Sequence, residues 1–382
     1  MSNTFDVVVV GAGILGAATA FELSKVGLKV AVIEQGAINR AGSGATAGNL
    51  HIQAVHRKRP QQEIPLDQFR FLPLQLAASR LWDAVESELE SDIEMRRVGG
   101  ITVAESEADV IEILDKRQVE IDLGIPGEIL DPAQLRDFEP LLGPHIKMAE
   151  FCPLDGYVNP LKITPAWLRA GVRRGVNVNP FTPVSSISRE GGGWRVTSNS
   201  ESWSAEKVVL VVGPWMTQLL KLVGVQIRMN PVAIQMHLTE RAPPTMRYLV
   251  QHIGQGLSVK QVTSGQILIG GGWPAKSLNL GGVSPVSFDS VVGNLQLATK
   301  VLPFLEHHRL LRSWTGALGA TADEMPVIGE IQETPGIFIA GGTYSFTFAP
   351  LWAKILMQLI TNQNPELSIK GLEPERLIET KK

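Results

Sequence analysis

The sequence predicts a mixed α/β protein, in which a Rossmann-like domain with a parallel sheet is joined to a second domain with an antiparallel sheet. Residues 7–10 are four valines, typical of a buried parallel strand, and glycines and an alanine-rich helical segment over 14–26 follow directly. The apolar runs 208–212 and 336–340 are predicted to rejoin the same sheet. Residues 226–272 instead contain short strands separated by turns, which indicates an antiparallel sheet.

Length, composition and charge limit the classes of function. The chain has 382 residues, of which 44% are hydrophobic, with 37 glycines and 24 prolines. This is enough for about two or three domains with a large core and many turns. The formal net charge of −3 offers no long-range attraction for nucleic acid or anionic lipid, and we expect the dense basic run 57–59 to be a solvated loop. We therefore expect no nucleic-acid partner.

The cysteines and histidines exclude several kinds of site. The single cysteine, Cys152, excludes an internal disulfide and an iron–sulfur cluster within this chain, because a cluster needs about four ligands. The seven histidines include no HExxH pattern, and we do not expect the adjacent pair His307 and His308 to converge on one ion, so no metal is predicted. The apolar stretch 7–21 is shorter than the ~20 residues of a membrane span, and no Lys or Arg precedes it. These features predict an unprocessed cytoplasmic protein without a transmembrane segment.

The glycines that follow the first strand predict a dinucleotide site. Gly11 and Gly13 let the backbone turn sharply and approach a pyrophosphate, and Gly16 lets the helix pack close to the sheet. The helix directs its N-terminal N–H groups and the positive end of its dipole at the phosphates. Glu34 follows 23 positions after Gly11, where its carboxylate can accept both hydroxyls of an adenosine ribose. Because an acid disfavours a 2′-phosphate at this place, NADP is not expected.

The remaining elements follow from periodicity and capping residues. A small-residue loop over 36–50 can lie flat against a planar ligand, and Asp131 is a suitable N-cap for a short helix. Further helices are expected over 66–89, 109–123, 132–138, 159–174, 288–302 and 350–360, and further strands over 97–103, 184–188, 194–198 and 202–205. The chain is expected to cross between its domains more than once. The predicted division is a discontinuous nucleotide-binding domain of residues 1–90, 145–222 and 308–382, and a substrate-binding domain of residues 91–144 and 223–307.

Four segments recur in this order in the FAD-dependent D-amino-acid oxidase and glycine oxidase (DAO) family. They are the glycine fingerprint, the loop 36–50, the strand end 211–215 and the segment 323–329. The chain resembles this family over nearly its whole length. Within the family, residues 43–53 and 344–350 are most similar to the β subunits of opine (octopine and nopaline) dehydrogenases and their hydroxyproline-dehydrogenase and cyanide-synthase relatives.

The resemblance implies a fold of the glutathione-reductase/DAO type and a non-covalently bound FAD. It puts the pyrophosphate at the glycine fingerprint, the adenine beside Val184 and the isoalloxazine edge at residues 48–51. Backbone N–H groups of residues 342–348 would lie near the flavin N1–C2=O, where negative charge develops on reduction. The implied cofactor-binding residues are Gly11, Gly13, Ile14, Leu15, Gly16, Glu34, Gln35, Ser43, Ala45, Gly48, Asn49, Leu50, His51, Val184, Gly213, Trp215, Gly316, Gly342, Tyr344, Ser345, Phe346, Thr347 and Phe348.

One departure from the family pattern bears on the substrate. Amino-acid oxidases of the family carry a Trp-x-Gly-x-Arg-Pro pattern whose arginine clamps the substrate carboxylate, but here residues 314–319 have Leu318 at that position. A free α-amino acid would lose a charge-assisted bidentate contact. We therefore expect the carboxylate to be met by Lys260, Arg57 or His51, or the substrate to be something other than a simple amino acid. For Lys260 the alternative is an exposed strand lysine.

A second departure bears on the electron acceptor. Sarcosine-oxidase-like relatives carry a lysine on a strand over the flavin that helps oxygen accept electrons, whereas the similar strand here, 266–272, holds no cation. Reactivity with oxygen is therefore not expected. Because the chain has too few cysteines for a cluster and no second GxGxxG, the expected acceptor is an iron–sulfur cluster or second flavin on a partner subunit, a quinone or a soluble carrier.

The resemblance and these departures predict the FAD-dependent oxidation of a C–N bond in an amino-acid-derived secondary amine such as an opine. Hydride would pass from the substrate α-carbon to flavin N5, and water would hydrolyse the resulting imine. An apolar pocket that lowers the amine's pKa from ~10 can replace a dedicated base. His51, Tyr344 and Lys260 are the candidate catalytic residues, and the chain would serve as the catalytic β subunit of a hetero-oligomeric dehydrogenase.

Three alternatives remain open on the sequence. A self-sufficient glycine, sarcosine or D-amino-acid oxidase would make peroxide from the isolated chain. A non-catalytic FAD-binding scaffold subunit would hold the cofactor without being reduced by any amine. An NAD-dependent dehydrogenase fits the first 34 residues but does not explain the motifs near Gly48 and Gly342.

Overall fold

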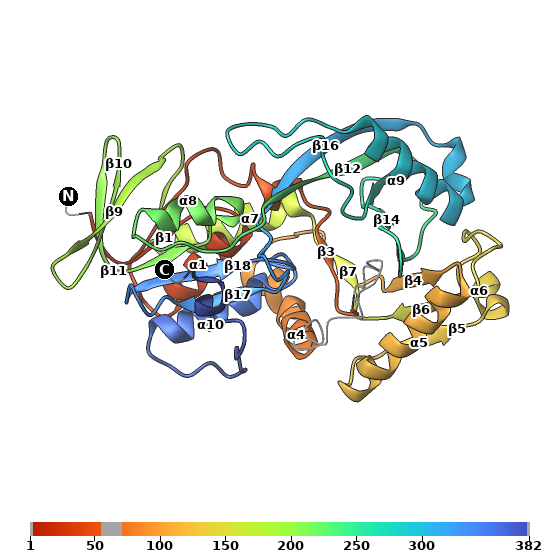
Figure 1. Cartoon of the computed structure of the whole chain (residues 1–382), viewed down its shortest axis with the longest axis horizontal. Coiled ribbons are helices and arrows are strands. Elements are labelled where there is room, and N and C mark those ends of the chain that lie inside the picture. Colours follow the sequence, from red (N-terminus) through yellow and green to blue (C-terminus); the bar gives the residue numbers. More distant parts are fainter. Residues whose placement is uncertain (1–2, 55–70, 380–382) are drawn as a thin grey trace.

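Two β-sheets with helices packed against them form the structure, a computed structural model that describes residues 3–54 and 71–379 (Figure 1). The first sheet lies at the left of Figure 1 and the second at the right, and the long strands β12 (Val232–Arg241) and β16 (Leu310–Leu318) reach from the second sheet towards the first. The predicted fold class, a Rossmann-like domain with a second, largely antiparallel sheet, is confirmed.

The first sheet has the parallel core that the valine run predicts. Its strands are β1 (Thr4–Val10), β2 (Val30–Ile33), β8 (Asn177–Asn179), β9 (Val184–Glu190), β10 (Gly193–Ser198), β11 (Ser202–Leu210), β17 (Val327–Glu330) and β18 (Ile337–Gly341). The spatial order is β17-β18-β11-β1-β2-β8, and β1 is parallel to both β2 and β11. The β9–β10 hairpin extends this sheet beyond β11. The carboxyl ends of β1, β2 and β11 therefore meet at one edge of the sheet.

One strand prediction in this sheet is wrong. The expected separate strands 202–205 and 208–212 are a single strand, β11, which ends at Leu210. Residues 202–205 pair with β10 on one side, and residues 204–210 pair with β1 on the other. The ladder therefore continues through Glu206 and Lys207.

The second sheet is antiparallel except for one parallel pair. Its strands are β4 (Gly100–Ala104), β5 (Glu128–Leu130), β6 (Met148–Cys152), β12, β13 (Leu249–His252), β14 (Ser258–Gln261), β15 (Gln266–Gly270) and β16. The order is β16-β12-β15-β14-β13-β4-β6-β5, with β13 parallel to β4. Strands β6 and β16 lie in this sheet, although the predicted boundaries assigned residues 145–222 and 308–382 to the first domain. The hydrophobic pattern of a strand does not reveal its partner, and here β6 pairs with β4 and β16 with β12.

Helices cover the two sheets separately. Those packed on the first domain are α1 (Ile14–Lys25), α4 (Leu72–Leu89), α7 (Pro160–Arg173), α8 (Met216–Lys221) and α10 (Ala349–Ile360). Those of the second domain are α5 (Glu107–Asp122), α6 (Pro132–Phe138), α9 (Phe288–Val301) and the 3₁₀ turn η2 (Pro303–His307). Shorter elements are α2 (Gly42–Ala45), η1 (Gly213–Trp215), η3 (Pro374–Leu377) and the small sheet of β3 (Asn49–Leu50) with β7 (Gly156–Tyr157).

Capping residues place several helix starts where the sequence predicts them. Asp131 caps α6 by accepting hydrogen bonds from the backbone N–H groups of Ala133 and Gln134. Asn159 caps α7 in the same way through Leu161 N–H. Helix α4 begins at Leu72, and the preceding part of the predicted helix, 66–70, lies outside the described residues.

Large apolar side chains fill the interior of the first domain. Trp82 of α4 lies against Trp167 of α7 with ring centroids 5.4 Å apart, and Trp352 of α10 stacks on Phe348 at 4.5 Å. All four rings are almost fully buried. Helices α1, α4, α7 and α10 therefore form one packed layer on a face of the first sheet.

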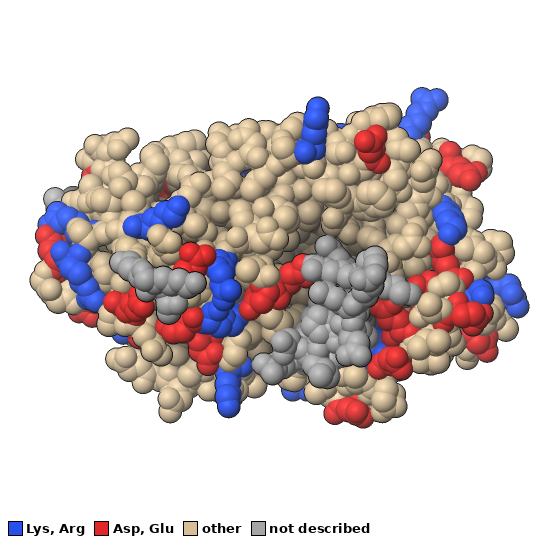
Figure 2. Space-filling model, in the orientation of Figure 1, with Lys and Arg blue, Asp and Glu red and all other residues tan. Residues whose placement is uncertain are grey.

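The surface shows no extended region of one charge on the face drawn in Figure 2, where Lys and Arg mix with Asp and Glu over its lower half. This mixture agrees with the net charge of −3. Among the helices of residues 3–54 and 71–379, none is long and apolar enough to cross a membrane.

Candidate active site

A cavity of about 1700 Å³ lies between the two sheets. This exceeds the ~300–1,000 Å³ of most single-ligand pockets, so a dinucleotide and a smaller molecule can fit together. One end is formed by the carboxyl ends of β1, β2 and β11, and the opposite wall by residues of β12, β13, β14 and β16. Long ligands bind at this edge of open α/β sheets.

The glycine fingerprint forms the end of the cavity at β1. A Cβ on Gly16 would lie 1.8 Å from the Gly11 carbonyl oxygen, and one on Gly11 would lie 2.7 Å from the Val211 carbonyl oxygen. Gly11 also has φ +105°, a conformation that L side chains rarely adopt. These contacts bring α1, β1 and the end of β11 together without side chains between them, which leaves backbone facing the cavity.

Polar groups of the first domain are arranged around the start of α1. Glu34 accepts hydrogen bonds from Ala12 N–H at 2.8 Å and from Gly36 N–H at 2.9 Å, so its carboxylate is held in one orientation beside the glycine turn. The Ser43 hydroxyl accepts from Ile14 N–H at 3.0 Å. The roles of ribose-binding acid and phosphate-binding hydroxyl stay predictions for Glu34 and Ser43.

The small-residue loop after β2 is held against the second sheet. Trp314 donates its indole N–H to the Ala45 carbonyl at 2.8 Å, and a Cβ on Gly316 would lie 2.7 Å from the Ala45 Cβ. Ser258 and Lys260 of β14 contact the next stretch: Asn49 donates to the Ser258 hydroxyl at 2.7 Å, and Lys260 Nζ donates to Asn49 Oδ1 at 2.6 Å. This segment is thus positioned by side chains from the other domain.

Lys260 does not line the cavity. Its Nζ also donates to the Ala47 carbonyl at 2.5 Å and lies 4.4 Å from the centre of the Tyr157 ring. The residue is 2% exposed, and burial lowers its pKa well below the usual range. These contacts direct Lys260 at residues 47–49 rather than at a substrate, and they also exclude the alternative of an exposed strand lysine.

The turn before α10 closes the cavity on the side of β18. Tyr344 has φ +59° and Gly342 φ +87°, so two residues of this short turn adopt the left-handed conformation. Non-glycine residues held in this conformation cluster at functional sites. The Thr347 hydroxyl accepts from His51 N–H at 3.3 Å, which joins this turn to the small-residue loop. Both His51 and Tyr344 line the cavity.

Most of the predicted cofactor-binding residues line the cavity. They are Gly11, Gly13, Ile14, Leu15, Glu34, Gln35, Ser43, Ala45, Asn49, His51, Val184, Gly213, Trp215, Gly316, Gly342, Tyr344, Ser345, Phe346 and Thr347. The predicted residues that lie behind this lining are Gly16, Gly48, Leu50 and Phe348. Gly16 and Gly48 allow close backbone approach, to Gly11 and to Val158, and Leu50 and Phe348 are completely buried. Arg57 lies outside the described residues.

The wall formed by the second sheet contains residues that the sequence analysis did not identify. Met236 of β12, Gln251 and His252 of β13, Gln255, and Ser258 of β14 all line the cavity. The available signal was a polar residue inside an otherwise apolar strand, as in Leu-Val-Gln-His over 249–252. Polar residues in a strand do not indicate which face of the sheet contacts a ligand.

Leu318 lines the cavity at the position where the family pattern has an arginine. Among the described lining residues, the lysine and arginine side chains are those of Arg40 and Arg376. Arg376 is paired with Asp323 and donates to the Pro326 carbonyl at 2.6 Å. Neither arginine belongs to the second sheet, so that wall carries no permanent positive charge.

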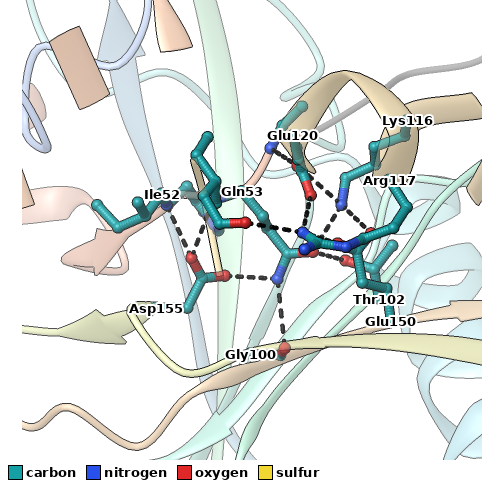
Figure 3. A network of polar contacts seen from close by, with 12 residues as sticks. Ile52, Gln53, Gly100, Thr102, Lys116, Arg117, Glu120, Glu150 and Asp155 are labelled. Carbon is teal, nitrogen blue, oxygen red and sulfur yellow. Dashed lines mark hydrogen bonds and ion pairs between the residues drawn. The ribbon is translucent and has the colours of Figure 1, made fainter. Parts of the chain in front are cut away.

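The segment after His51 is held by a network of buried polar groups (Figure 3). Asp155 Oδ1 accepts from Ile52 N–H at 2.7 Å and from Gln53 N–H at 3.2 Å. Glu120 of α5 accepts from Ala54 N–H at 2.7 Å. Figure 3 shows Asp155 on one side of this segment and the α5 residues on the other. The cavity residue His51 therefore precedes a stretch whose backbone is fixed from both sides.

Buried charges at the far end of this network are paired. Lys116 lies 3.0 Å from Glu120 and 2.5 Å from Glu150, and all three side chains are fully buried. Burial disfavours the charge of Lys116, but the two carboxyls raise its pKa. Burial, together with a hydrogen bond to Glu120, raises the pKa of Glu150 to about 8. Burial and the neighbouring Glu120 carboxyl therefore favour the protonated form of Glu150.

Within residues 3–54 and 71–379, no group of three or more His, Cys, Asp and Glu side chains could hold a metal ion. Cys152 is buried, and burial raises the pKa of its thiol, so it is not a reactive group.

Comparison with known proteins agrees with the geometry. The family described as FAD dependent oxidoreductase (DAO) matches residues 6–359. The chain is 27% identical over 367 residues to glycine oxidase of Geobacillus kaustophilus (strain HTA426), with 94% of each chain covered. It is 25% identical over 364 residues to an opine oxidase subunit of Agrobacterium tumefaciens (strain Ach5), with 93% of each covered. The crystal structure of glycine oxidase from Geobacillus kaustophilus matches with a TM-score of 0.88 at 25% identity, covering 98% of this chain and 100% of that one.

Proposed function

The chain belongs to the FAD-dependent oxidoreductase (DAO) family, and from this premise we propose that it oxidises a C–N bond of an amino-acid-derived secondary amine, such as an opine. FAD is its cofactor, and when bound it supplies the acceptor for a hydride from the substrate α-carbon. The observation that carries the proposal is one cavity bounded by a dinucleotide cradle on one sheet and a side-chain wall on the other.

The residues present fit FAD in two respects. The cradle at Gly11, Gly13 and Gly16 is one that a Cβ would fill, as a pyrophosphate beside a helix N-terminus requires. The cavity is also long enough to continue from Glu34 past residues 45–51 to the turn at 342–347. We propose that the lining residues of these segments hold the cofactor.

The proposed roles of the other residues follow from their positions. His51 and Tyr344 line the cavity beside the loop and the turn, and we assign them to orienting the substrate. Met236, Leu318 and Phe346 supply apolar surface, which favours the neutral amine that the reaction requires. Lys260 is assigned as a positioning residue for residues 47–49, because its ammonium group contacts that segment and not the cavity.

We propose that the chain works with a partner subunit as a dehydrogenase. One of its relatives, the opine oxidase chain of Agrobacterium tumefaciens, is itself named as a subunit. The single cysteine cannot hold an iron–sulfur cluster, so a second redox centre of that kind would belong to another chain. The second candidate function is a self-sufficient amine oxidase, which the relative named glycine oxidase favours.

An anaerobic reduction experiment tests the proposed function. The purified holoprotein is mixed in turn with octopine, nopaline, proline, hydroxyproline, sarcosine and glycine, its flavin absorbance is followed, and the sample is then opened to air. Bleaching by a secondary amine with slow recovery in air is the expected result. Rapid recovery with peroxide formation would favour the oxidase, and absence of bleaching by every amine would contradict both.

The same assay examines the assigned side chains. His51→Ala and Tyr344→Phe are expected to lower kcat/KM about tenfold or more, whereas His307→Ala, which changes an exposed histidine of η2, should leave it unchanged. Unchanged kcat and KM in both cavity variants would refute their assignment.

A further inference from the structure

An unpaired amide oxygen lies in the cavity wall at the centre of the second sheet. Gln251 of β13 lines the cavity and is 2% exposed. Within the described part of the chain, its Oε1 has no hydrogen-bond partner. A buried acceptor left unpaired loses its hydrogen bonds to water without replacement, so most such groups in native proteins have a partner. A donor supplied by a ligand would satisfy Gln251 Oε1.

The strand register shows that this amide belongs to a row of polar residues on one face of the sheet. Gln251 lies directly opposite Ser258 of β14 and directly opposite Thr102 of β4. Thr102 in turn lies opposite Glu150 of β6. Side chains directly opposite each other project from the same face of a sheet. The row therefore runs from the buried ion pairs of α5 and β6 to the cavity.

The direction of each hydrogen bond in this row is set by Lys116. An ammonium group only donates, and Lys116 Nζ lies 3.0 Å from Gln53 Oε1, so that atom must be the amide oxygen. The Thr102 hydroxyl is 2.6 Å from the same oxygen and must donate to it. The hydroxyl oxygen of Thr102 can then only accept a further hydrogen bond, and Gln251 Nε2 donates to it at 3.1 Å. Gln251 Oε1 is consequently turned away from Thr102.

Asp155 enforces the same orientation. Its Oδ2 accepts from Gln53 Nε2 at 2.8 Å and lies 3.5 Å from Gln251 Nε2. Reversal of the Gln251 amide would bring its oxygen against a carboxylate, which is repulsive. The orientation of the Gln251 amide is therefore fixed by groups on β4, α5 and the segment before β7.

The charge of the surrounding wall selects the kind of donor. Glu112 and Asp115 of α5 also line the cavity, while the two arginines of the lining lie on other segments. His252 accepts backbone N–H bonds from Gly254 and Gln255 at Nδ1, and burial lowers its pKa. Beside Glu112 and Asp115, the wall therefore favours an N–H donor over a second carboxylate.

We propose that Gln251 Oε1 accepts a hydrogen bond from the amine N–H of the substrate, and that Thr102 positions it. This assignment rests on the proposed function, because it names the residue by which the site recognises an amine. A ligand with an ether oxygen in place of the N–H would set two acceptors against each other. The site therefore favours amines over their ether analogues, because the hydrogen bonds that lead from Lys116 through Gln53 and Thr102 fix the orientation of the Gln251 amide.

Matched ligand pairs test the assignment in the holoprotein. The pairs are sarcosine with methoxyacetate, L-proline with tetrahydrofuran-2-carboxylate, and iminodiacetate with oxydiacetate. Rapid anaerobic mixing gives the Kd of each ligand, from perturbation of the flavin spectrum or from the concentration dependence of flavin reduction. In the wild type, the amine of at least one pair is expected to bind more tightly than its ether.

Gln251→Leu is expected to reduce that preference about tenfold, because it removes both the hydrogen bond to the amine and the repulsion of the ether. Gln118→Leu, which changes an exposed glutamine of α5, should retain the wild-type ratio. Thr102→Val should reduce the preference about threefold through KM, with kcat little changed, and Thr102→Ser should restore it. The threonine pair remains informative if Gln251→Leu does not fold.

Two results separate the possible failures. An unchanged ratio in both Gln251→Leu and Thr102→Val would overturn the recognition role while leaving the proposed function intact. A ratio that depends on Gln251, in protein whose flavin is reduced by no amine, would support the recognition role and contradict the proposed function.

Discussion

The two domains hold their sides of the cavity by different means. On the first sheet, the backbone at Gly11 and Gly16 packs directly against other backbone atoms, because neither residue has a side chain to keep them apart. On the second sheet, buried polar side chains are paired in a directed network from Lys116 to Gln251. The proposed cofactor end is therefore shaped by sterics within a short stretch of chain. The proposed substrate end is shaped by electrostatics between distant residues.

This contrast indicates how each side can fail. A glycine cradle is sensitive to added volume and insensitive to pH. A buried polar network is sensitive to the loss of one partner, because the remaining charge is left without compensation. Single substitutions can distinguish sensitivity to added volume from sensitivity to the loss of a polar partner.

The largest effect is expected from Lys116→Met. This change removes the nearer cation of Glu120 and Glu150 and leaves Arg117 at 3.6 and 3.5 Å, and the loss of a buried pairing partner costs up to about 3–5 kcal/mol of unfolding free energy. Lys147→Met is the matched control, because Lys147 pairs with Glu107 at the surface, where a pair contributes about 0–1 kcal/mol. Denaturant unfolding of both holoproteins provides the comparison. Equal stability of the two variants would show that the network does not support the second domain.

Gly16→Ala should come next, with its effect confined to the cofactor end. The new Cβ would lie 1.8 Å from the Gly11 carbonyl oxygen, so α1 must move away from β1. Overpacking of this kind costs roughly 1–3 kcal/mol, which corresponds to about 5- to 150-fold weaker FAD binding if the cost falls on the cradle. Fluorescence titration of the apoprotein with FAD measures the Kd of the variant and of the wild type.

Gly192→Ala is the control for that experiment, because a Cβ there would have no neighbour within 4 Å. It is expected to bind FAD as the wild type does. If Gly16→Ala also bound FAD normally, the close approach of α1 to β1 would not be what shapes the cradle.

The smallest effect, visible only in acid, is expected from His237→Asn. Burial on β12 lowers the pKa of His237 from 6.5 to about 4. The unfolded chain therefore binds a proton in this range that the folded protein does not. The stability from this group is fully present above pH 6.5 and is lost as the pH falls towards 4. At pH 5 the loss is about 2 kcal/mol.

Asn can retain the hydrogen bond that His237 Nδ1 makes with the Ser313 hydroxyl at 2.8 Å, and it does not titrate. The difference in thermal midpoint between pH 7.5 and pH 5 should consequently be smaller in the variant than in the wild type. An unchanged pH dependence would mean that His237 is not responsible for acid sensitivity in the second sheet.

The sequence by itself determined the elements at the proposed cofactor end of the protein. The valine run, Gly11 to Gly16, Glu34 and the cap at Asp131 predict elements that the structure contains, because turns, caps and close helix packing depend on neighbouring residues. The family and its cofactor were also predicted correctly from such local motifs.

Only the tertiary structure decided the proposed substrate end. Strands β6 and β16 belong to the second sheet because of their pairing partners, and Lys260 is buried because Ala47 and Asn49 accept its hydrogen bonds. Gln251 is oriented by Thr102, 149 positions away in sequence. Burial, pKa and hydrogen-bond direction are properties of residues brought together by folding. No periodicity or spacing within a strand specifies which distant side chain will complete its hydrogen bonds.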